Sequence, residues 1–302
     1  MNVKFGAIAD LHTEFIFDGA ERMERFLETC RRERVDFCIQ LGDFCPPGPI
    51  NREHKESILS MLDRSGIPFY HVIGNHDTDE NSKSDVLSYI GAPDGPLSFD
   101  RGGVHFVILD ACYYREGNEC HHYDKGNYRH VSAEMPVLPA EELDWLREDL
   151  SKAEYPSVIF SHQSLVESRT GIRNTKKFRC VAESAPNGVA LAVCGHEHVD
   201  RLEFKNGVAY YCLNSASYYW AGSKYAHSTY GGKIETDHPM LRNVFPYKDP
   251  LFAIFEMSGC DVRVTGTASE FVGDSPSELG FNKRGLKDMI TPTIKDRAFK
   301  IL

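Results

Sequence analysis

The sequence predicts a single globular domain with an α/β fold, and three observations lead to this expectation. In the first half of the 302-residue chain, short apolar runs alternate with segments whose apolar residues recur at helical spacing, which is typical of helices packed on a sheet. Charged residues make up 26% of the chain and hydrophobic residues 41%, ordinary values for a globular protein. No internal repeat, low-complexity tract or composition break marks a linker, so we expect one domain over residues 1–302.

The N-terminal part of the chain predicts three pairs of a strand and a helix. Each expected strand is a short apolar run. The first expected helix carries Met23, Phe26, Leu27 and Cys30 at spacings of three and four, which forms one apolar face. The expected strands cover residues 3–9, 35–41 and 67–73, and the two later helices cover residues 51–65 and 82–90.

A hairpin of residues 97–100 and 104–109 follows, because a Gly-Gly turn signal separates two apolar runs. Later, Leu143, Leu146 and Leu150 form an inward helical stripe after Pro139, a residue that suits a first helical turn. The remaining expected elements are strands at 158–160, 189–194, 199–204 and 208–213, a helix at 175–183, and a C-terminal hairpin of 251–257 with 261–267. The tail that completes the segment 251–302 shows no clear periodicity.

Two long segments, residues 111–137 and 217–248, interrupt the alternation with polar and aromatic residues that show no period. Loops of this length inside a compact domain are usually functional or mobile, so both segments are candidates for a lid. Tyr113 and Tyr218 would then stack on a base or an aryl leaving group. The alternative is a hydrophobic cluster in which these rings only pin the loop.

Charge and composition disfavour several classes of partner. The formal net charge of −10 and a pI of about 5.7 argue against a nucleic-acid polymer. No apolar run approaches about 20 residues, so we expect no membrane span. The nine cysteines lack a Cys-x-x-Cys pair, and the chain starts directly with strand-like residues, which together favour reduced thiols in the cytoplasm. The sequence carries no signal for an oligomeric state.

Polar side chains follow five of the expected strands, at the edge of a sheet where ligands of α/β folds collect. In chain order these residues are Asp10 and His12, then Asp43, then Asn75, His76 and Asp77, then His162, and last His196 and His198. In an extended segment, Asp-x-His and His-x-His would place both side chains on one side. Oxygen and imidazole donors without thiolate suit Mn, Fe or Zn, and a set this large suits two ions that share a carboxylate.

Taken singly, each of these residues is as easily explained by turn chemistry or by a strand-end cap. His76 and Asp77 could likewise form a structural pair without a role in chemistry. The joint pattern, which repeats after five strands, is what favours a metal site.

The five segments resemble the motifs of the calcineurin-like metallophosphoesterase superfamily, namely Asp-x-His, Gly-Asp, Gly-Asn-His-Asp, a lone His after a strand, and Gly-His-x-His. The resemblance covers residues 10–198. It implies two packed mixed β-sheets flanked by helices, a four-layer αββα sandwich, with two metal ions at the sheet ends. It assigns Asp10, His12, Asp43 and His198 to the first ion, and Asp43, Asn75, His162 and His196 to the second. It also implies that Asn75 and His76 face the substrate and that Asp77 orients His76.

The implied function is hydrolysis of a phosphoester by a hydroxide that bridges the two ions, with His76 as general acid for the leaving oxygen. A small phosphodiester or nucleotide-type molecule is the favoured substrate, because Asp-x-His resembles the phosphodiesterase branches. The alternatives are a phosphomonoesterase or a nucleoside-diphosphate-type pyrophosphohydrolase. The purple acid phosphatase branch carries a tyrosine ligand after the second motif. Phe44, Cys45 and Pro46 stand there in this chain, which argues against a tyrosinate-bound ferric site.

A different class of function also stays open, a catalytically inactive binding or scaffold protein on the same fold. Such members usually lack some of the ligands, and no motif position lacks its ligand here. A metalloprotease is not supported, because the sequence contains no His-Glu-x-x-His helix.

Overall fold

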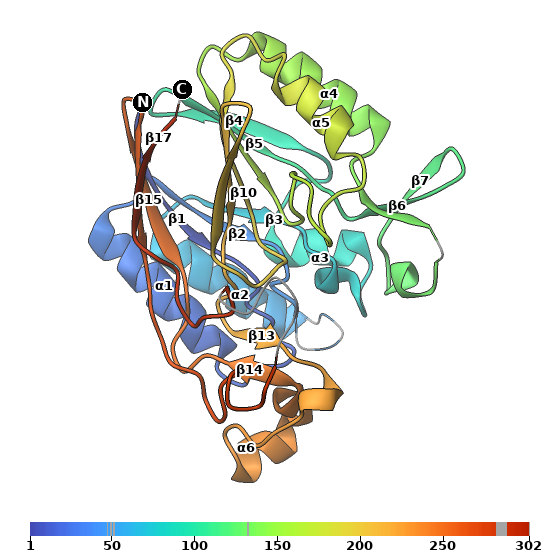
Figure 1. Cartoon of the computed structure of the whole chain (residues 1–302), viewed down its shortest axis with the longest axis vertical. Helices are drawn as coiled ribbons and strands as arrows, with labels where there is room; N and C mark the ends of the chain where they lie inside the picture. The colour runs from blue at the N-terminus through green and yellow to red at the C-terminus, as the bar shows by residue number, and fades with distance from the viewer. Residues whose placement is uncertain (47, 49, 51, 132, 282–288, 302) are drawn as a thin grey trace.

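The computed structural model describes residues 1–46, 48, 50, 52–131, 133–281 and 289–301. Two six-stranded mixed sheets lie face to face, and helices cover their outer sides (Figure 1). This arrangement confirms the predicted α/β class and the four-layer sandwich. Position 51 of the helix expected at 51–65 lies outside the described residues, as do position 132 of the 111–137 segment and positions 282–288 and 302 of the tail.

The first sheet has a parallel half and an antiparallel half, which meet at β1 (Asn2–Ile8). On one side β1 pairs in parallel with β2 (Phe37–Leu41), which pairs in parallel with β3 (Phe69–Val72). The antiparallel half consists of β15 (Ala253–Ser258), β16 (Asp261–Gly266) and β17 (Arg297–Lys300). The predicted C-terminal hairpin is confirmed as β15 and β16. The tail adds the edge strand β17, which the prediction lacked.

Three helices cover the outer face of this sheet. Helix α1 (Gly19–Glu33) buries the stripe predicted from the spacing of its apolar residues, and the stripe packs against Ile8 and Ile254. Burial of each large apolar side chain is worth about 1.5–3 kcal/mol. Helices α2 (Arg52–Ser65) and α3 (Lys83–Ile90) lie beside α1, close to their predicted bounds.

The second sheet has a parallel centre and antiparallel edges, in the order β11-β12-β10-β9-β5-β4. Helices α4 (Ala140–Lys152) and α5 (Thr175–Ala182) cover its outer face. Its strands are β4 (Leu97–Arg101), β5 (Val104–Ile108), β9 (Ser157–Ser161), β10 (Val189–Cys194), β11 (Arg201–Lys205) and β12 (Val208–Cys212). These strands and helices match the predictions to within a few residues at their ends.

Aromatic rings join the two sheets across the central core. Phe5 of β1 stacks between Phe37 and Phe255 of its own sheet, with ring centroids 5.1 and 4.9 Å apart. It meets Phe106 and Phe160 of the second sheet edge-on, at 5.8 and 5.6 Å. Contacts of this kind add to the burial of the rings and fix how one sheet sits on the other.

The two segments expected as irregular loops contain secondary structure, so that expectation was wrong. Residues 111–137 form β6 (Tyr113–Glu116), β7 (Glu119–His122), β8 (Glu134–Val137) and the 3-10 turn η2 (Asn127–His130). Residues 217–248 form β13 (Tyr218–Trp220), η3 (Ser223–Tyr225), α6 (Gly232–Asp237), η4 (Pro239–Asn243) and β14 (Val244–Pro246). These strands are three or four residues long, too short to show a period of two.

Two predictions concern the chain as a whole. All nine cysteines are free, which agrees with the expected reduced thiols. Within the described part of the chain, no helix combines the length and the apolar composition needed to cross a membrane.

Candidate metal centre

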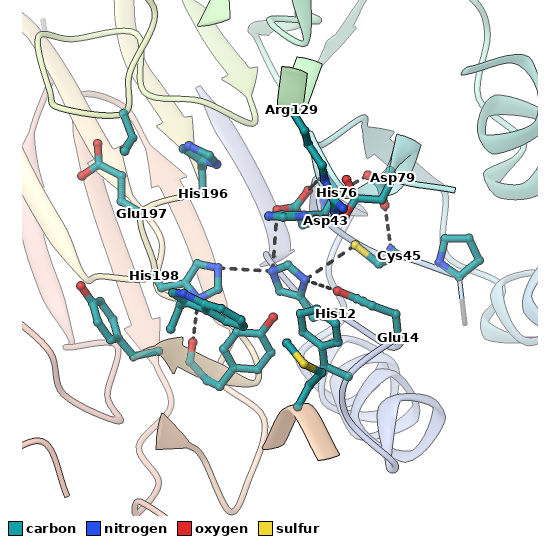
Figure 2. A pocket seen from close by; sticks show the side chains of 18 of the residues that line it. His12, Glu14, Asp43, Cys45, His76, Asp79, Arg129, His196, Glu197 and His198 are labelled. Carbon is teal, nitrogen blue, oxygen red and sulfur yellow. Dashed lines mark hydrogen bonds and ion pairs between the residues drawn. The ribbon is translucent and has the colours of Figure 1, made fainter. Parts of the chain in front are cut away.

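The polar residues predicted after β1, β2, β3, β9 and β10 converge at one end of the two sheets. Two groups of possible ligands form there, Asp10 with His12 and His198, and Asp43 with His162 and His196. Within each group, one donor atom of every residue lies within 4.8 Å of the others. Figure 2 shows His12, Asp43, His196 and His198 around a shared space, and these residues come from three turns that are far apart in the sequence.

The turns that carry these residues adopt left-handed backbone conformations, which glycine reaches most easily. Six residues other than glycine have positive φ there: Asp10 (51°), His12 (55°), Asp43 (54°), Cys45 (56°), His196 (69°) and His198 (53°). The expectation that Asp-x-His and His-x-His are extended was therefore wrong, since tight turns bring the donors together. Each such residue costs about 1–2 kcal/mol, which the surrounding structure must offset.

Hydrogen bonds between neighbouring turns hold this backbone in place. The Asp10 amide donates to the Gly42 carbonyl at 3.0 Å, and the His12 amide donates to the Asp43 carbonyl at 3.0 Å. Gly74 lies so close to the second turn that an added Cβ would be 2.1 Å from the Asp43 nitrogen. A glycine is therefore required before the Asn-His-Asp sequence for steric reasons.

In the first donor group, the Nδ1 atoms of both histidines are occupied. His12 Nδ1 lies 2.8 Å from Glu14 Oε1, and His198 Nδ1 lies 2.7 Å from the Tyr218 carbonyl oxygen. Each Nδ1 therefore carries the ring proton, and each Nε2 is left with a lone pair. The two Nε2 atoms face each other at 3.3 Å, and Asp10 Oδ1 lies 3.3 Å from His198 Nε2.

The second donor group repeats this pattern. His162 Nδ1 donates to the Leu41 carbonyl at 2.8 Å, which leaves Nε2 as an acceptor. That Nε2 atom lies 3.0 Å from Asn75 Oδ1, 3.2 Å from Asp43 Oδ2 and 3.2 Å from His196 Nδ1. Side-chain atoms of three other residues thus surround this nitrogen.

Asp43 lies between the two groups, with Oδ2 3.7 Å from His12 Nε2 and 3.2 Å from His162 Nε2. Burial raises the pKa of its carboxyl, but the charges of His162 and His76 outweigh burial and hold that pKa well below its usual range. Burial likewise lowers the pKa of His12 and His162, yet nearby carboxylates raise these pKa values to about 9 and about 10. The carboxylates thus favour a positive charge at the Nε2 atom of each ring, either a second ring proton or a bound cation that takes its place.

These residues fit two transition-metal ions of the kind predicted. Where the imidazoles are neutral, these acceptor atoms lie 3.0–3.3 Å apart and repel one another, and a cation between them would be stabilised. No Lys or Arg side chain of the described residues contacts Asp10 or Asp43. The donors are imidazole nitrogen with carboxylate or amide oxygen, a set that suits Mn, Fe or Zn. Asp43 is within reach of both groups and is the residue that would be shared.

His76 begins the short 3-10 turn η1 (His76–Thr78) on the pocket wall. Its Nδ1 atom lies 2.7 Å from Asp79 Oδ2, so the expectation that Asp77 orients His76 was wrong (Figure 2). Asp77 instead accepts backbone hydrogen bonds at 2.7–3.0 Å from Asp43, Cys45 and Gly74. Its carboxylate ties the turn after β2 to the turn after β3, which is a structural role.

A cavity of about 1020 Å³ opens over the donor groups. Tyr218 lines this cavity and stacks on His12, with ring centroids 4.9 Å apart, where a substrate-contacting residue was expected. Tyr113 is not among the lining residues, and its hydroxyl accepts a hydrogen bond from Lys83 at 3.3 Å. The structure therefore gives no support to Tyr113 as a substrate contact.

Four lining residues have contacts that sequence reading did not anticipate: Glu14, Cys45, Asp79 and Arg129. Glu14 and Cys45 form a third group of possible ligands with His12. Asp79 pairs with Arg129 as well as with His76. For Glu14 and Asp79, the sequence offers one clue to a role in the site. Each of these acidic residues follows a predicted site residue within three positions.

The fold and the donor groups define the class of protein. A four-layer sandwich with His, Asp and Asn donors at the carboxyl ends of its parallel strands is the architecture of metallophosphoesterases. The model of the calcineurin-like phosphoesterase family matches residues 3–200, and the chain belongs to this family. No curated protein matches the sequence.

Solved structures share the fold at low sequence identity. A dimetal phosphatase from Danio rerio is 18% identical, with a TM-score of 0.62 over 90% of this chain and 99% of that one. A purple acid phosphatase from Lupinus luteus seeds is 10% identical, with a TM-score of 0.53 over 99% of this chain and 54% of that one. GAP50, the anchor in the inner membrane complex of Plasmodium, is 14% identical, with a TM-score of 0.52 over 91% and 89%. These likenesses show the fold alone, so the chemistry rests on this chain's own residues.

Proposed function

We propose that this protein is a metal-dependent phosphoester hydrolase that acts on a small phosphodiester or nucleotide-type molecule. One observation carries the proposal. His162 Nε2 lies 3.0 Å from Asn75 Oδ1 and 3.2 Å from Asp43 Oδ2, and all three residues are buried. Two buried oxygen acceptors around an imidazole nitrogen favour a positive charge at that nitrogen, and a metal ion would supply it in place of a ring proton.

The donors divide between two ions as the family resemblance implies. Asp10, His12, Asp43 and His198 would hold the first ion, and Asp43, Asn75, His162 and His196 would hold the second. When bound, two such ions supply Lewis acidity toward phosphoryl oxygens and activate water near neutral pH.

His76 is our candidate for the general acid. Asp79 occupies its Nδ1 atom, so Nε2 is the ring nitrogen left to give a proton to the leaving oxygen. Burial lowers the pKa of His76, but the charge of Asp43 and the hydrogen bond with Asp79 outweigh burial and raise it. The protonated ring that an acid requires is therefore favoured here. Its side chain is 37% exposed and lines the cavity, which leaves it accessible to a bound ester.

The size of the cavity supports a substrate that is larger than phosphate alone. Pockets for small organic ligands typically measure roughly 300–1,000 Å³, and this one measures about 1020 Å³. A phosphomonoester or a pyrophosphate of similar bulk would also fit. The alternative of an inactive scaffold is less well supported, because the side chains of all the predicted donors are present and lie near one another. Free thiols on all nine cysteines agree with a reducing compartment such as the cytoplasm.

The test is metal analysis of the purified protein, coupled to a panel of phosphoesters. The panel includes an aryl phosphodiester, nucleoside monophosphates, cyclic nucleotides and nucleotide sugars. We expect two ions per chain and turnover of at least one ester. Asp43→Asn should lose both metal and activity, whereas His76→Ala should keep the metal and lose most of its turnover.

Two results would overturn the proposal. The first is metal-loaded protein that turns over no member of the panel. The second is equal activity of the wild type, Asp43→Asn and His76→Ala, which would place any observed hydrolysis elsewhere.

A further inference from the structure

We infer that the substrate carries a flat aromatic ring on the alcohol side of its ester, and that Trp220 and Phe15 bind this ring while the buried Tyr218 supports them from behind. The inference rests on the proposed function and narrows it to a class of substrate. The shared chemistry is an aromatic ring joined to a phosphate, which nucleotides and aryl esters both offer.

Trp220 is the residue that first points to a ligand. Among the described residues, the large hydrophobic side chains that are exposed are Phe17, Tyr155, Phe204 and Trp220. Of this set, Trp220 alone lines the cavity above the donor groups, with 43% of its surface accessible. Single exposed hydrophobic residues are common on protein surfaces, but one that opens into a polar, metal-binding cavity is in the right place to cover a ligand.

Trp220 belongs to a continuous aromatic wall that starts at the donor groups. The rings of His12 and Phe15 lie 5° from parallel with centroids 6.1 Å apart, and those of Phe15 and Trp220 lie 31° from parallel at 6.1 Å. Tyr218 completes the inner end of the wall, 4.9 Å from the His12 ring and 6.2 Å from the Phe15 ring. The wall therefore extends outward from His12, a candidate metal ligand, first to Phe15 and then to Trp220.

The backbone explains why these rings share one side of the cavity. In β13, side chains alternate, so Tyr218 and Trp220 point the same way, while Tyr219 points the other way and reaches only the rim of the cavity lining. Tyr219 accordingly packs against Phe281, with centroids 5.8 Å apart. Phe15 reaches the wall from the turn after β1, where its amide donates to the His12 carbonyl at 3.1 Å.

The angles between the rings favour a flat ligand. Organic cations such as choline are bound by rings that surround them from several directions. Here neighbouring rings lie within 5–33° of parallel with centroids 4.9–6.2 Å apart, so they partly overlap as a stack that ends at the exposed Trp220 and do not form an enclosure. An exposed ring at the end of a stack suits offset stacking of a further aromatic ring.

The distance between the ligand's ring and its phosphate distinguishes an aryl ester from a nucleotide, because the rings of the wall lie at different distances from the donor groups. An aryl ester holds its ring one bond from the phosphate oxygen, beside Phe15. A nucleobase is held away from the phosphate by a sugar and reaches the outer ring, Trp220. Dependence on Trp220 therefore indicates a nucleotide, and dependence on Phe15 without Trp220 indicates an aryl ester.

The chain offers a direct optical test, because it has two tryptophans. Trp145 lies on α4 and packs into the core outside the second sheet, away from the cavity. In Trp145→Phe, Trp220 is the remaining tryptophan, and its emission reports what binds beside it. Adenosine monophosphate should change this emission, whereas ribose 5-phosphate, which has the same sugar and phosphate without the base, should not.

Calorimetry gives the strength of ring recognition. Adenosine monophosphate should bind more tightly than ribose 5-phosphate by roughly 5- to 150-fold, the range expected when one aromatic contact is gained. Trp220→Leu should remove most of this difference. The matched control is Tyr155→Leu, an exposed aromatic residue outside the cavity, which should retain it. Phenyl phosphate in the same titrations tests whether the protein recognises an aryl ester.

Equal dissociation constants for phenyl phosphate, adenosine monophosphate and ribose 5-phosphate would overturn the inference, even if the protein hydrolyses esters. An affinity gap that Trp220→Leu and Phe15→Leu both leave intact would overturn it as well. A gap that depends on these rings, in a protein that turns over no ester, would instead support the ring site and contradict the proposed hydrolase.

Discussion

His76 Nδ1 lies 2.7 Å from Asp79 Oδ2, and two residues from a distant part of the chain hold that carboxylate in turn. The Tyr128 hydroxyl donates to Asp79 Oδ1 at 2.5 Å, and Arg129 pairs with Asp79 Oδ2. Both belong to η2, within the 111–137 segment. The segment therefore acts on the candidate acid through Asp79.

Asp79→Asn should lower kcat by on the order of 10- to 100-fold, part of the roughly 10²–10⁴ that general acid catalysis contributes. The reason is that the amide no longer favours the protonated imidazole. KM and metal content should change little, and Asp79→Glu should restore part of the rate. An unchanged kcat in Asp79→Asn would show that this contact plays no part in the chemistry.

Tyr128→Phe should have a smaller effect on kcat in the same direction, because it removes one of the contacts to Asp79 and keeps the ring. The residues form one chain of contacts, so their effects should not add. In the double variant with Asp79→Asn, the loss of Tyr128 should cost almost nothing further. Additive losses in this double-mutant cycle would mean that Tyr128 acts by another route.

Asp77→Asn should lower stability more than it lowers catalysis by folded protein. Its carboxylate accepts three backbone hydrogen bonds, and an amide NH₂ would face at least one of these donors. A buried donor left unsatisfied costs about 1–3 kcal/mol. Urea unfolding of Asp77→Asn and Asp79→Asn should separate the two roles, with the larger loss in Asp77→Asn. The reverse order would contradict the assignment.

Glu14→Gln should weaken metal binding by roughly 10- to 100-fold, the usual effect of losing a carboxylate behind a histidine ligand. Glu14 Oε1 accepts the Nδ1 proton of His12 at 2.8 Å, which makes Nε2 a better donor. Competition with a chromophoric chelator measures the affinity. Glu80→Gln is the matched control, since Glu80 lines the same cavity and has no hydrogen bond to a proposed ligand among the described residues. Equal metal affinities in Glu14→Gln and Glu80→Gln would mean that the loss of any negative charge in the cavity weakens metal binding, and not the loss of the contact with His12.

His71→Phe should remove a source of acid sensitivity. Burial between Phe44 and Phe69 lowers the pKa of His71 to about 3, and neither ring nitrogen has a hydrogen-bond partner among the described residues. Below pH 6.5 the unfolded chain binds a proton there and the folded chain does not, so stability falls as pH falls. The wild type should lose about 1.4 kcal/mol more than the variant between pH 7.5 and 5.5.

His105 serves as a control for that measurement, because its contribution to stability changes with pH in the opposite direction from that of His71. Burial lowers its pKa, but hydrogen bonds with Asp149 and Asp100 outweigh burial and raise it above the ordinary value. Its contribution to stability is full below pH 6.5 and is lost as pH rises through the raised pKa. Urea unfolding of His105→Gln should therefore approach the wild type at higher pH. A pH-independent gap in both variants would refute this account.

The sequence predicts the strands, helices and donor residues well because their signals are local. Met23, Phe26 and Cys30 show a helical face by spacing alone, and Asp43 or His162 can be placed by the strand that precedes each one. The parallel pairing of these strands then brings their ends together.

The partner of His76 could not be predicted in this way. A 3-10 turn places positions i and i+3 on the same side, so Asp79 meets the ring while Asp77, next in sequence, turns toward the backbone. Whether a chain turns at that point depends on the tertiary contacts around it. The short strands β6, β7 and β13 escaped prediction for a related reason, since tertiary packing and not a period of two defines them.

Backbone hydrogen bonds within the protein close the left-handed turns at Asp10, His12 and Asp43. Metal binding would then follow folding as a separate step, and refolding rates with and without a chelator should coincide. The ion that the surroundings supply most readily would decide what the centre contains. The identity of the metal would thus reflect the habitat of the protein as much as its shape.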